Sequence, residues 1–406
     1  FVMKKKKSWV KKRHVFIKKA LHFFFYLPMK LKYRYSYEKF KIKKGEKYIV
    51  VCNHTTTLDP VFLNLSFNKM LYFVGSDDLF NIKYLSWWLQ YLTGIIPKSK
   101  GKSDIGTVKT MLRVLKEGAT VAVFPEGNRT YSGELCYISP AITKFFMMSK
   151  VPIVIYNIEG GYGVDPRWGL KKRKGKLCGK IKRVLYPDEY KTFTEEELHN
   201  LILNELNLKN APSENPYKSK INAECIERVL FRCPECGMVN TITSCGSNFS
   251  CSNCNSKWEY TESLTIKKDG VLYKHPVIND WYKEQLEYIK SFDTTIESVI
   301  FEDNNLEIYS FTSGKNKTLL GTGSLKLFNS HLEFETDTNK YIYNIDEIDG
   351  VSVAGKSGVL FRFEDKAFRI RDNQEQRNNF NSLKYVLMIN HIKNRKKGEN
   401  DEFLGI

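Results

Sequence analysis

Between residues 48 and 208, short apolar runs alternate with segments in which apolar residues recur at helical spacing. The runs are rich in β-branched residues, which favour strands. They are residues 48–52, 71–75, 120–124 and 153–158. Residues 105–115 carry one apolar face and predict a helix, and residues 195–206 predict another, which Thr194 caps. Strands and helices in alternation are typical of an α/β domain, which we bound at residues 46–210.

The pattern changes after a linker at residues 210–216, which contains two prolines and interrupts the periodicity. From residue 298 onward, short runs of alternating polarity are separated by turn residues. These runs are residues 298–301, 306–311, 324–328, 331–334, 341–345, 359–363 and 367–370. Residues 380–388 then predict an amphipathic helix. We therefore expect residues 263–406 to form a small antiparallel sandwich or barrel that is closed by a helix.

Residues 1–45 interleave lysine and arginine with aromatic and aliphatic side chains, and Glu38 is the first acidic residue. The longest uncharged run there, residues 20–29, is too short to span a bilayer, and no small-residue cleavage pattern follows it. Such a segment is typical of an amphipathic membrane-surface anchor, with apolar side chains at the acyl boundary and lysines on anionic headgroups. The alternative is a helix that packs on the following domain while its lysines are solvated.

The formal net charge of +19 indicates a partner with a negative surface. A phospholipid bilayer, a nucleic acid and an acidic carrier protein all meet this description. A second basic cluster, at residues 171–183, has two interpretations. It binds acyl carrier protein or anionic lipid, or it is a solvated hairpin.

His54 and Asp59 lie five positions apart in the sequence Asn-His-Thr-Thr-Thr-Leu-Asp-Pro. On a regular helix, residues at this spacing lie about 140° apart around the axis, so at least one of them must lie in a loop. Because a strand is predicted just before His54 and Pro60 suits a first helical turn, we expect His54 in the loop and Asp59 in the opening turn. The carboxylate would then orient the imidazole, whose other nitrogen takes a proton from a hydroxyl. A lone histidine at a strand end is more often a buried structural residue.

A second motif, Phe-Pro-Glu-Gly-Asn-Arg-Thr, follows the predicted strand at residues 120–124. Proline and glycine end the strand, so Glu126 and Arg129 are expected to emerge at its end. The planar guanidinium of arginine suits phosphate oxygens, and glycine permits close approach of the backbone. Glu126 would orient Arg129 or bind a hydroxyl of the acceptor. The alternative is a turn with an incidental surface ion pair.

These residues resemble a known family, the glycerophospholipid acyltransferases, typified by 1-acylglycerol-3-phosphate acyltransferase. The Asn-His-x4-Asp motif of that family corresponds to residues 53–59, and its Phe-Pro-Glu-Gly-x-Arg-Ser block corresponds to residues 124–130. Residues 96–100 resemble its Ile-Pro-x-x-Arg motif, and residues 151–154 resemble its Val-Pro-Ile-Val block. The four motifs occur in the order of the family, within the α/β domain.

The resemblance implies that His54 is the general base and that Asp59 orients it. It also implies a thioester donor, acyl-CoA or acyl-ACP (ACP, acyl carrier protein), as co-substrate, and lysophosphatidic acid or a related lysophospholipid as acceptor. The implied substrate-binding residues are Lys98, Lys100, Glu126, Gly127, Asn128, Arg129 and Thr130. Lys100 stands where the family usually has arginine and lacks its two-pronged donor geometry. A peripheral or monotopic enzyme at the cytoplasmic face of a membrane is therefore expected.

Nine cysteines in a chain with no recognised secretion signal favour reduced thiols over disulfides. Two Cys-x2-Cys pairs stand out, and their members are Cys233, Cys236, Cys251 and Cys254. Their spacing predicts a structural zinc ribbon over residues 221–262, with redox-active iron as the alternative. Four thiolates would close the site, so the zinc is given no catalytic role. We expect Trp258 and Tyr260 to supply the core of the ribbon and Cys245 to be spare.

The tail from about residue 298 resembles lipid-associated pleckstrin-homology or GRAM-like domains. The alternative is a β domain that packs against the rest of the chain or binds a partner protein.

Two further functions compete with acyl transfer. The net charge and the zinc ribbon would suit a nucleic-acid-binding protein, although the positive charge is concentrated beside bulky apolar residues at the N-terminus, which makes nucleic acid an unlikely partner. The other is a catalytically silent lipid-binding protein, against which the intact His54 and Asp59 argue.

Overall fold

The structure is a computed structural model that describes residues 8–76, 85–98, 105–311, 317–364, 366–373 and 380–399. The chain forms two compact units. The first comprises Phe1–Asn128, Ile138–Gly161 and Gly175–Leu208, and the second comprises Arg129–Tyr137, Tyr162–Lys174 and Lys209–Ile406. The division differs from the sequence-based boundaries, because two short segments between residues 129 and 174 group with the C-terminal part of the chain.

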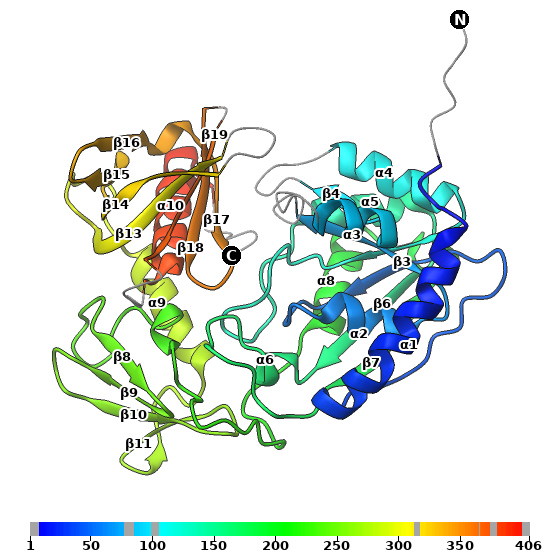
Figure 1. The fold of residues 1–406 in the computed structure, drawn as a ribbon, viewed down its shortest axis with the longest axis horizontal. Coiled ribbons are helices and arrows are strands. Elements are labelled where there is room, and N and C mark those ends of the chain that lie inside the picture. Colours follow the sequence, from blue (N-terminus) through cyan, green and yellow to red (C-terminus); the bar gives the residue numbers. More distant parts are fainter. Residues whose placement is uncertain are drawn as a thin grey trace, which may run out of the picture. The chain divides into compact units, whose positions relative to one another are not determined.

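A seven-stranded sheet forms the centre of the first unit, in the order β1-β7-β6-β2-β5-β3-β4 (Figure 1). Its strands are β1 (Ser36–Tyr37), β2 (Ile49–Cys52), β3 (Leu71–Ser76), β4 (Ile96–Lys98), β5 (Thr120–Val123), β6 (Ile153–Glu159) and β7 (Cys178–Leu185). Neighbouring strands are parallel except for β6 and β7. Every residue of β2 and of β5 is buried, as expected for parallel strands covered on both faces. The four strands predicted for this region are confirmed.

Helices precede, connect and follow these strands in the sequence. They are α1 (Arg13–Tyr33), α2 (Asp59–Ser66), α3 (Leu85–Thr93), α4 (Ile105–Lys116), α5 (Ala141–Ser149), α6 (Gly161–Val164), α7 (Pro187–Tyr190) and α8 (Glu195–Leu206). The predicted helices at residues 105–115 and 195–206 are confirmed as α4 and α8. Thr194 caps α8 as expected, since its hydroxyl accepts a hydrogen bond from the Glu197 amide at 3.1 Å and the Glu197 carboxylate accepts one from the Thr194 amide at 2.7 Å.

α1 has one buried and one exposed side. His14, Lys18, Met29 and Tyr33 are buried, whereas most of its bulky apolar side chains are exposed. The exposed ones are Val15, Phe16, Phe23, Phe24, Tyr26, Leu27 and Leu31. Lys18 is a basic residue that does not reach solvent, because its ammonium donates to the Asn64 carbonyl and burial lowers its pKa to about 8. Among the helices of the described residues, none combines the length and apolarity that a bilayer crossing needs.

The second unit contains a five-stranded antiparallel sheet in the order β12-β11-β10-β9-β8. The strands are β8 (Ile242–Cys245), β9 (Asn248–Cys251), β10 (Lys257–Tyr260), β11 (Ile266–Lys268) and β12 (Val271–Leu272). A short helix, η2 (Ile226–Arg228), precedes them, and α9 (Ile278–Lys290) follows. Trp258 and Tyr260 are buried as expected, and Trp281 of α9 packs against Trp258 at a ring distance of 5.1 Å. The core of this region therefore includes a helix beyond the predicted ribbon.

A second antiparallel sheet, in the order β16-β15-β14-β13-β19-β18-β17, forms the rest of the second unit (Figure 1). Its elements are β13 (Phe301–Phe311), β14 (Lys317–Leu327), β15 (His331–Thr336), β16 (Lys340–Asn344), η3 (Ile345–Glu347), β17 (Ile348–Ala354), β18 (Gly358–Phe363), β19 (Lys366–Asp372) and α10 (Ser382–Lys397). The β-rich region with a closing helix is confirmed. β17 was not predicted, and of the predicted run at residues 298–301 only Phe301 lies in a strand, as the first residue of β13.

The closing helix differs from its prediction in one respect. Instead of one apolar face, α10 is buried at every position from Ser382 to Ile389. Lys384 lies within this stretch, and its ammonium is 2.5 Å from the Asp303 carboxylate of β13. A helix covered on all sides tolerates a lysine there because the ion pair satisfies the buried charge.

Gly179 of β7 lies at a tightly packed position in the first unit. A Cβ atom at this position would lie 2.0 Å from the Tyr156 hydroxyl and 2.5 Å from the Tyr35 hydroxyl, both of which are buried. Gly179→Ala is therefore expected to lower the free energy of unfolding by about 1–3 kcal/mol, the usual cost of overpacking. Denaturant unfolding of the purified protein measures this. Lys182→Ala, an exposed position on the same strand, is the control and should change stability by less than about 0.5 kcal/mol.

Candidate active site

The loop between β2 and α2 carries His54, and α2 begins at Asp59, as predicted. Asn53 fixes the start of this loop to β6. Its side-chain amide donates to the Ile158 carbonyl at 3.1 Å, and its side-chain oxygen accepts from the Ile158 amide at 2.8 Å. The pairing mimics one more step of the β2–β6 ladder, so both polar groups of the Asn53 side chain tie the residue before His54 to β6.

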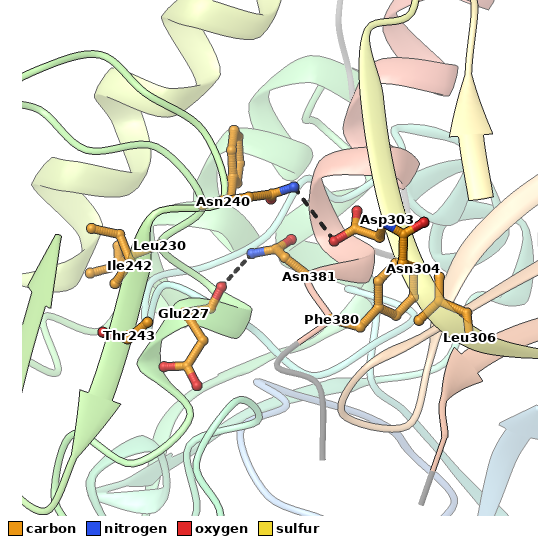
Figure 2. A pocket seen from close by; sticks show the side chains of 11 residues that line it. Glu227, Leu230, Asn240, Ile242, Thr243, Asp303, Asn304, Leu306, Phe380 and Asn381 are labelled. Carbon is orange, nitrogen blue, oxygen red and sulfur yellow. Dashed lines mark hydrogen bonds between the residues drawn. The ribbon is translucent and has the colours of Figure 1, made fainter. Parts of the chain in front are cut away.

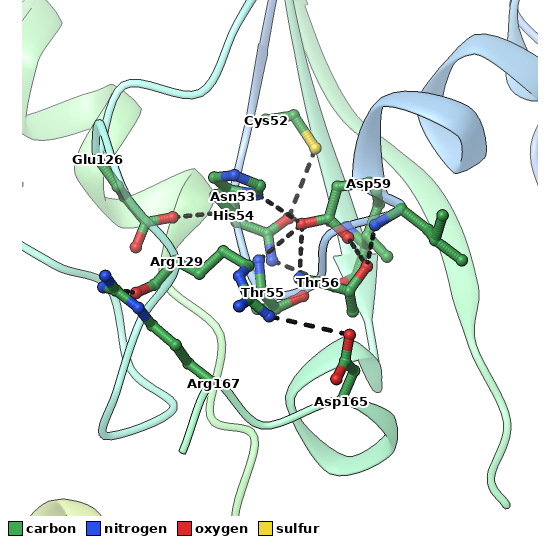
Figure 3. A network of polar contacts seen from close by, with 12 residues as sticks. Cys52, Asn53, His54, Thr55, Thr56, Asp59, Glu126, Arg129, Asp165 and Arg167 are labelled. Atoms are coloured by element: carbon green, nitrogen blue, oxygen red, sulfur yellow. Dashed lines mark hydrogen bonds and ion pairs between the residues drawn. The ribbon is translucent and has the colours of Figure 1, made fainter. Parts of the chain in front are cut away.

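The Asp59 carboxylate is completely buried and accepts four hydrogen bonds (Figure 3). Oδ2 is 2.8 Å from the His54 Nδ1 atom, and it accepts from the amides of Thr55 at 2.7 Å and Thr56 at 2.8 Å. Oδ1 accepts from the Thr56 hydroxyl at 2.6 Å. Several donors of this kind compensate a buried carboxylate for the loss of water. One side chain therefore fixes both the loop and the imidazole.

Hydrogen bonding through Nδ1 sets the state of the His54 ring. A neutral imidazole that donates from Nδ1 to a carboxylate presents an unprotonated Nε2 atom, which is the form that accepts a proton. Its ring stacks on Phe124 with centroids 4.4 Å apart, and a fifth of the side chain, 20%, is exposed. Phe124 thus covers one face of the ring and Asp59 holds its Nδ1 edge, while a fifth of the side chain stays accessible to solvent.

Glu126 reaches the same loop from β5, although it lies 72 residues along the chain from His54. β2 and β5 are adjacent parallel strands with Val51 opposite Val123, so their carboxyl ends lie at one edge of the sheet. The buried Glu126 carboxylate accepts the backbone amide of His54 at 2.6 Å. Gly127, with φ of 72°, makes the tight turn after it. Support of the His54 backbone is a role that the sequence did not predict for Glu126.

Gly161 follows β6 and lies directly against the His54 loop. A Cβ atom there would come within 2.1 Å of the Thr55 hydroxyl and 2.9 Å of the Thr56 side chain. Only glycine fits such an approach without displacing the loop. Thr55, Thr56 and Gly161 were not predicted as site residues from the sequence. In the structure, the Thr56 hydroxyl accepts from the Leu58 amide at 3.1 Å and also donates to Asp59.

Arg129 and Thr130 belong to the second unit. One guanidinium nitrogen of Arg129 is 3.8 Å from the Asp165 carboxylate, and Lys172 approaches the same carboxylate at 3.7 Å. The Thr130 hydroxyl accepts the Gly133 amide at 3.1 Å and so closes a turn. These contacts assign Thr130 a structural role in its loop, whereas Arg129 has an ion pair that is longer than a hydrogen bond.

The remaining predicted substrate contacts are less well defined. Lys98 ends β4 and is exposed, Asn128 ends the first unit at the turn after Gly127, and Lys100 lies outside the described residues. In the first unit, the structure thus brings His54, Asp59 and Glu126 together.

Part of the basic cluster at residues 171–183 makes contacts within its own unit. In the second unit, the buried Arg173 donates to the Asn222 carbonyl at 2.6 Å. In the first unit, Lys180 pairs with Glu159 at 2.8 Å and Arg183 pairs with Glu189 at 2.6 Å. Binding of acyl carrier protein or anionic lipid by the exposed lysines of the cluster stays a prediction.

The four cysteines of the predicted ribbon converge in the second unit, and their sulfur atoms all lie within 4.8 Å of one another. Cys233 and Cys254 approach to 3.8 Å, and Cys236 and Cys251 approach to 3.7 Å. Sulfur atoms at the corners of a tetrahedron with zinc–sulfur bonds of about 2.3 Å would be about 3.8 Å apart. The donor set therefore fits a zinc ion. The exposed Cys245 is not part of the group.

A cavity of about 340 Å³ lies elsewhere in the second unit (Figure 2). Its lining includes Glu227, Asn240, Asp303 and Asn381, none of which was predicted as a site residue. Burial raises the pKa of Glu227 to about 7, and one of its oxygens accepts the Ser244 hydroxyl at 2.6 Å. The Asp303 carboxylate accepts the Tyr385 hydroxyl at 2.7 Å. No histidine is among the described residues that line this cavity, so it has no counterpart of the His54–Asp59 pair.

Comparison with known proteins supports an acyltransferase domain in this chain. Residues 34–158 match the model of the Acyltransferase family. The 1-acyl-sn-glycerol-3-phosphate acyltransferase of Saccharomyces cerevisiae is 28% identical over 158 residues, which cover 37% of this chain and 50% of that protein. The enzyme of the same name from Bacillus subtilis is 25% identical over 125 residues, which cover 30% of this chain and 61% of that protein. The chain thus spans about half the length of the first of these relatives.

Among solved structures, the 1-acyl-sn-glycerophosphate acyltransferase of Thermotoga maritima is similar to this chain, with a TM-score of 0.41 and 24% sequence identity. The similarity covers 50% of this chain and 80% of that one.

The cysteine cluster predicts that the purified protein carries one zinc ion per chain. Cys236→Ser should abolish stoichiometric zinc binding, because it removes one of four thiolates, and should lower the thermal stability of the second unit, since metal binding by such modules contributes directly to folding. Elemental analysis and thermal unfolding measure the two effects. Cys245→Ser is the matched control and should retain the metal. Iron in place of zinc, or full zinc occupancy in Cys236→Ser, would contradict the assignment.

Proposed function

We propose that the protein transfers a fatty acyl group from a thioester donor, acyl-CoA or acyl-ACP, to the free hydroxyl of lysophosphatidic acid or a related lysophospholipid. The observation that carries this proposal is the 2.8 Å contact between His54 Nδ1 and the buried Asp59 carboxylate. It leaves Nε2 as a proton acceptor at the accessible edge of the ring. The relatives whose names specify 1-acyl-sn-glycerol-3-phosphate acyltransferase supply the reaction class.

In the proposed reaction, the acceptor hydroxyl attacks the thioester carbonyl directly. A carbon–oxygen bond forms, and the proton of the hydroxyl passes to His54 Nε2. The tetrahedral intermediate then collapses, the carbon–sulfur bond breaks, and the proton on Nε2 neutralises the departing thiolate. Asp59 stabilises the transient imidazolium without taking the proton. The protein supplies no nucleophile, so no acyl-enzyme forms.

Arg129 is proposed to bind the phosphate of the acceptor, together with Lys98, Lys100 and the turn at residues 127–130. A guanidinium offers paired donors that suit phosphate oxygens, and the backbone of Gly127 and Asn128 allows a close approach. Glu126 is proposed to act through the His54 backbone amide rather than on the acceptor.

His54→Gln tests the proposed base. The amide side chain is similar in size but cannot take up a proton, so acyl transfer should fall by about 10²–10⁴-fold, the usual contribution of a general base. The assay follows labelled acyl groups from each thioester donor to lysophosphatidic acid. His331→Gln, the same change in β15 of the second unit, is the control and should leave the rate unchanged. Undiminished transfer by folded His54→Gln would remove the proposed mechanism.

We further propose that the exposed faces of α1 and α3 bind an anionic membrane surface from the cytoplasmic side. The two helices are joined, because the Arg13 guanidinium lies 3.9 Å from the centre of the Tyr91 ring and donates to the Tyr91 carbonyl at 3.0 Å. Phe16 and Phe23 of α1 are 72% and 77% exposed, and Trp87 and Trp88 of α3 are 58% and 51% exposed. Aromatic side chains beside lysines are typical of interfacial helices. A pleckstrin-homology or GRAM-like role of the C-terminal domain stays a prediction.

Replacing Phe16, Phe23 and Leu31 by serine should weaken binding to vesicles that contain anionic lipid by at least about tenfold, because each exposed apolar side chain loses part of its transfer free energy. Vesicle co-sedimentation measures the change. The control replaces Leu319 and Ile342 of the second unit, which are 52% and 56% exposed, by serine. Equal loss of binding in the control and the α1 variant would refute a specific role for α1.

A further inference from the structure

Arg167 is an arginine in the second unit with an exposed fraction of only 1%, and none of the ion pairs found among the described residues includes it. Its guanidinium instead donates to three backbone carbonyls: Nη1 to Arg129 at 2.9 Å, Nη2 to Val353 at 2.8 Å, and Nε to Gly355 at 3.2 Å. Burial lowers its pKa, and the nearby charge of Arg129 acts in the same direction. Burying an arginine without an ion pair is costly, and the hydrogen bonds that compensate it join the segment of Arg167 to two others, at residue 129 and at residues 353–355.

The hairpin between β17 and β18 provides two of these carbonyls and makes further contacts of its own. Lys356, in the turn of the hairpin, donates to the carbonyls of Gly169 and of Leu170, the latter at 3.3 Å. The Tyr131 hydroxyl donates to the Lys356 carbonyl at 3.0 Å. The Arg167 guanidinium also lies 4.3 Å from the centre of the Tyr131 ring. The hairpin therefore contacts Tyr131 and residues 167–170 directly, and it reaches Arg129 through Arg167.

Both ends of Arg129 depend on this arrangement (Figure 3). Its carbonyl accepts from Arg167, and its guanidinium lies 3.8 Å from Asp165, two residues before Arg167 on the same segment. The segment that orients Arg129 is thus itself tied to a hairpin of the C-terminal domain.

We propose that Arg167 is a positioning residue for Arg129, and that the β17–β18 hairpin supports the acceptor-binding site through it. The proposal rests on the phosphate-binding role assigned to Arg129 under the proposed function. It gives the C-terminal β domain a part in acyl transfer, as the support of the acceptor's anionic group. The donor should bind independently of this contact, because Arg167 supports only the residue that binds the acceptor.

Arg167→Lys and Lys356→Met, each in the full-length protein, test the proposal from the two sides of the contact. Lysine keeps the charge of Arg167 but cannot reach the carbonyls of Arg129 and of the hairpin together. Each variant should raise KM for lysophosphatidic acid about tenfold, which corresponds to about 1.4 kcal/mol, while KM for the thioester donor stays unchanged. Lys340→Met is the matched control, since Lys340 pairs with Glu333 at the outer edge of the same domain, and it should leave both KM values unchanged.

Hydrogen exchange of the backbone amides at residues 129–137 provides a measurement that does not depend on activity. Exchange there should be faster in both variants than in the wild type and in Lys340→Met. A merely structural effect would lower the active fraction and leave both KM values unchanged, and that result would overturn the proposal. So would unaltered exchange in both variants. If the wild type does not acylate lysophosphatidic acid at all, the proposed function fails, and exchange alone decides whether the hairpin positions Arg129.

Discussion

The buried carboxylate of Asp59 is the interaction on which the first unit's candidate site depends. It lies at the first residue of α2, accepts two consecutive backbone amides and the hydroxyl of Thr56, and contacts the imidazole of His54. A carboxylate at a helix start is also stabilised by the helix dipole. Because the same group satisfies the loop and orients the ring, the conformation of the loop and the tautomer of His54 are set by one residue.

The order of strands in the sheet adds two further contacts to the His54 loop, from residues that are distant in sequence. β2 and β5 lie side by side and parallel, so the residues that follow them meet at the same edge. Glu126 uses this proximity to hold the amide of His54, and Asn53 uses the other neighbour, β6, in the same way. The backbone of the loop is thus held from both neighbours of β2, while Asp59 and Phe124 contact the imidazole itself. Preorganisation of this kind is what a general base requires, since a ring that must be ordered during the reaction contributes less to the rate.

Much of the first unit could be predicted from local patterns. The spacing of His54 and Asp59 required a loop before a helix, and Thr194 with Glu197 marked the start of α8. The cysteine spacing likewise predicted a cluster that the structure contains. Contacts that depend on tertiary pairing could not be predicted. Nothing near Glu126 in sequence indicates the amide of His54, and nothing near Arg167 indicates the carbonyls of Val353 and Gly355. β17 was missed because its short run has no strict alternation, with four consecutive buried residues at its end.

The path of the chain between the two units affects how the protein can form during synthesis. The chain leaves the first unit after Asn128 and again after Gly161, returning each time, and the carbonyl partners of Arg167 lie 186 and 188 residues later. At a translation rate of about 5–20 residues per second, Arg167 waits roughly ten to forty seconds for those partners. During that interval water solvates the Arg167 guanidinium. The contact between Arg167 and the Arg129 carbonyl is then not yet stabilised by the hairpin. The residues that form the His54 loop and its contacts are therefore synthesised well before Val353 and Gly355, which complete the packing around Arg167 and Arg129.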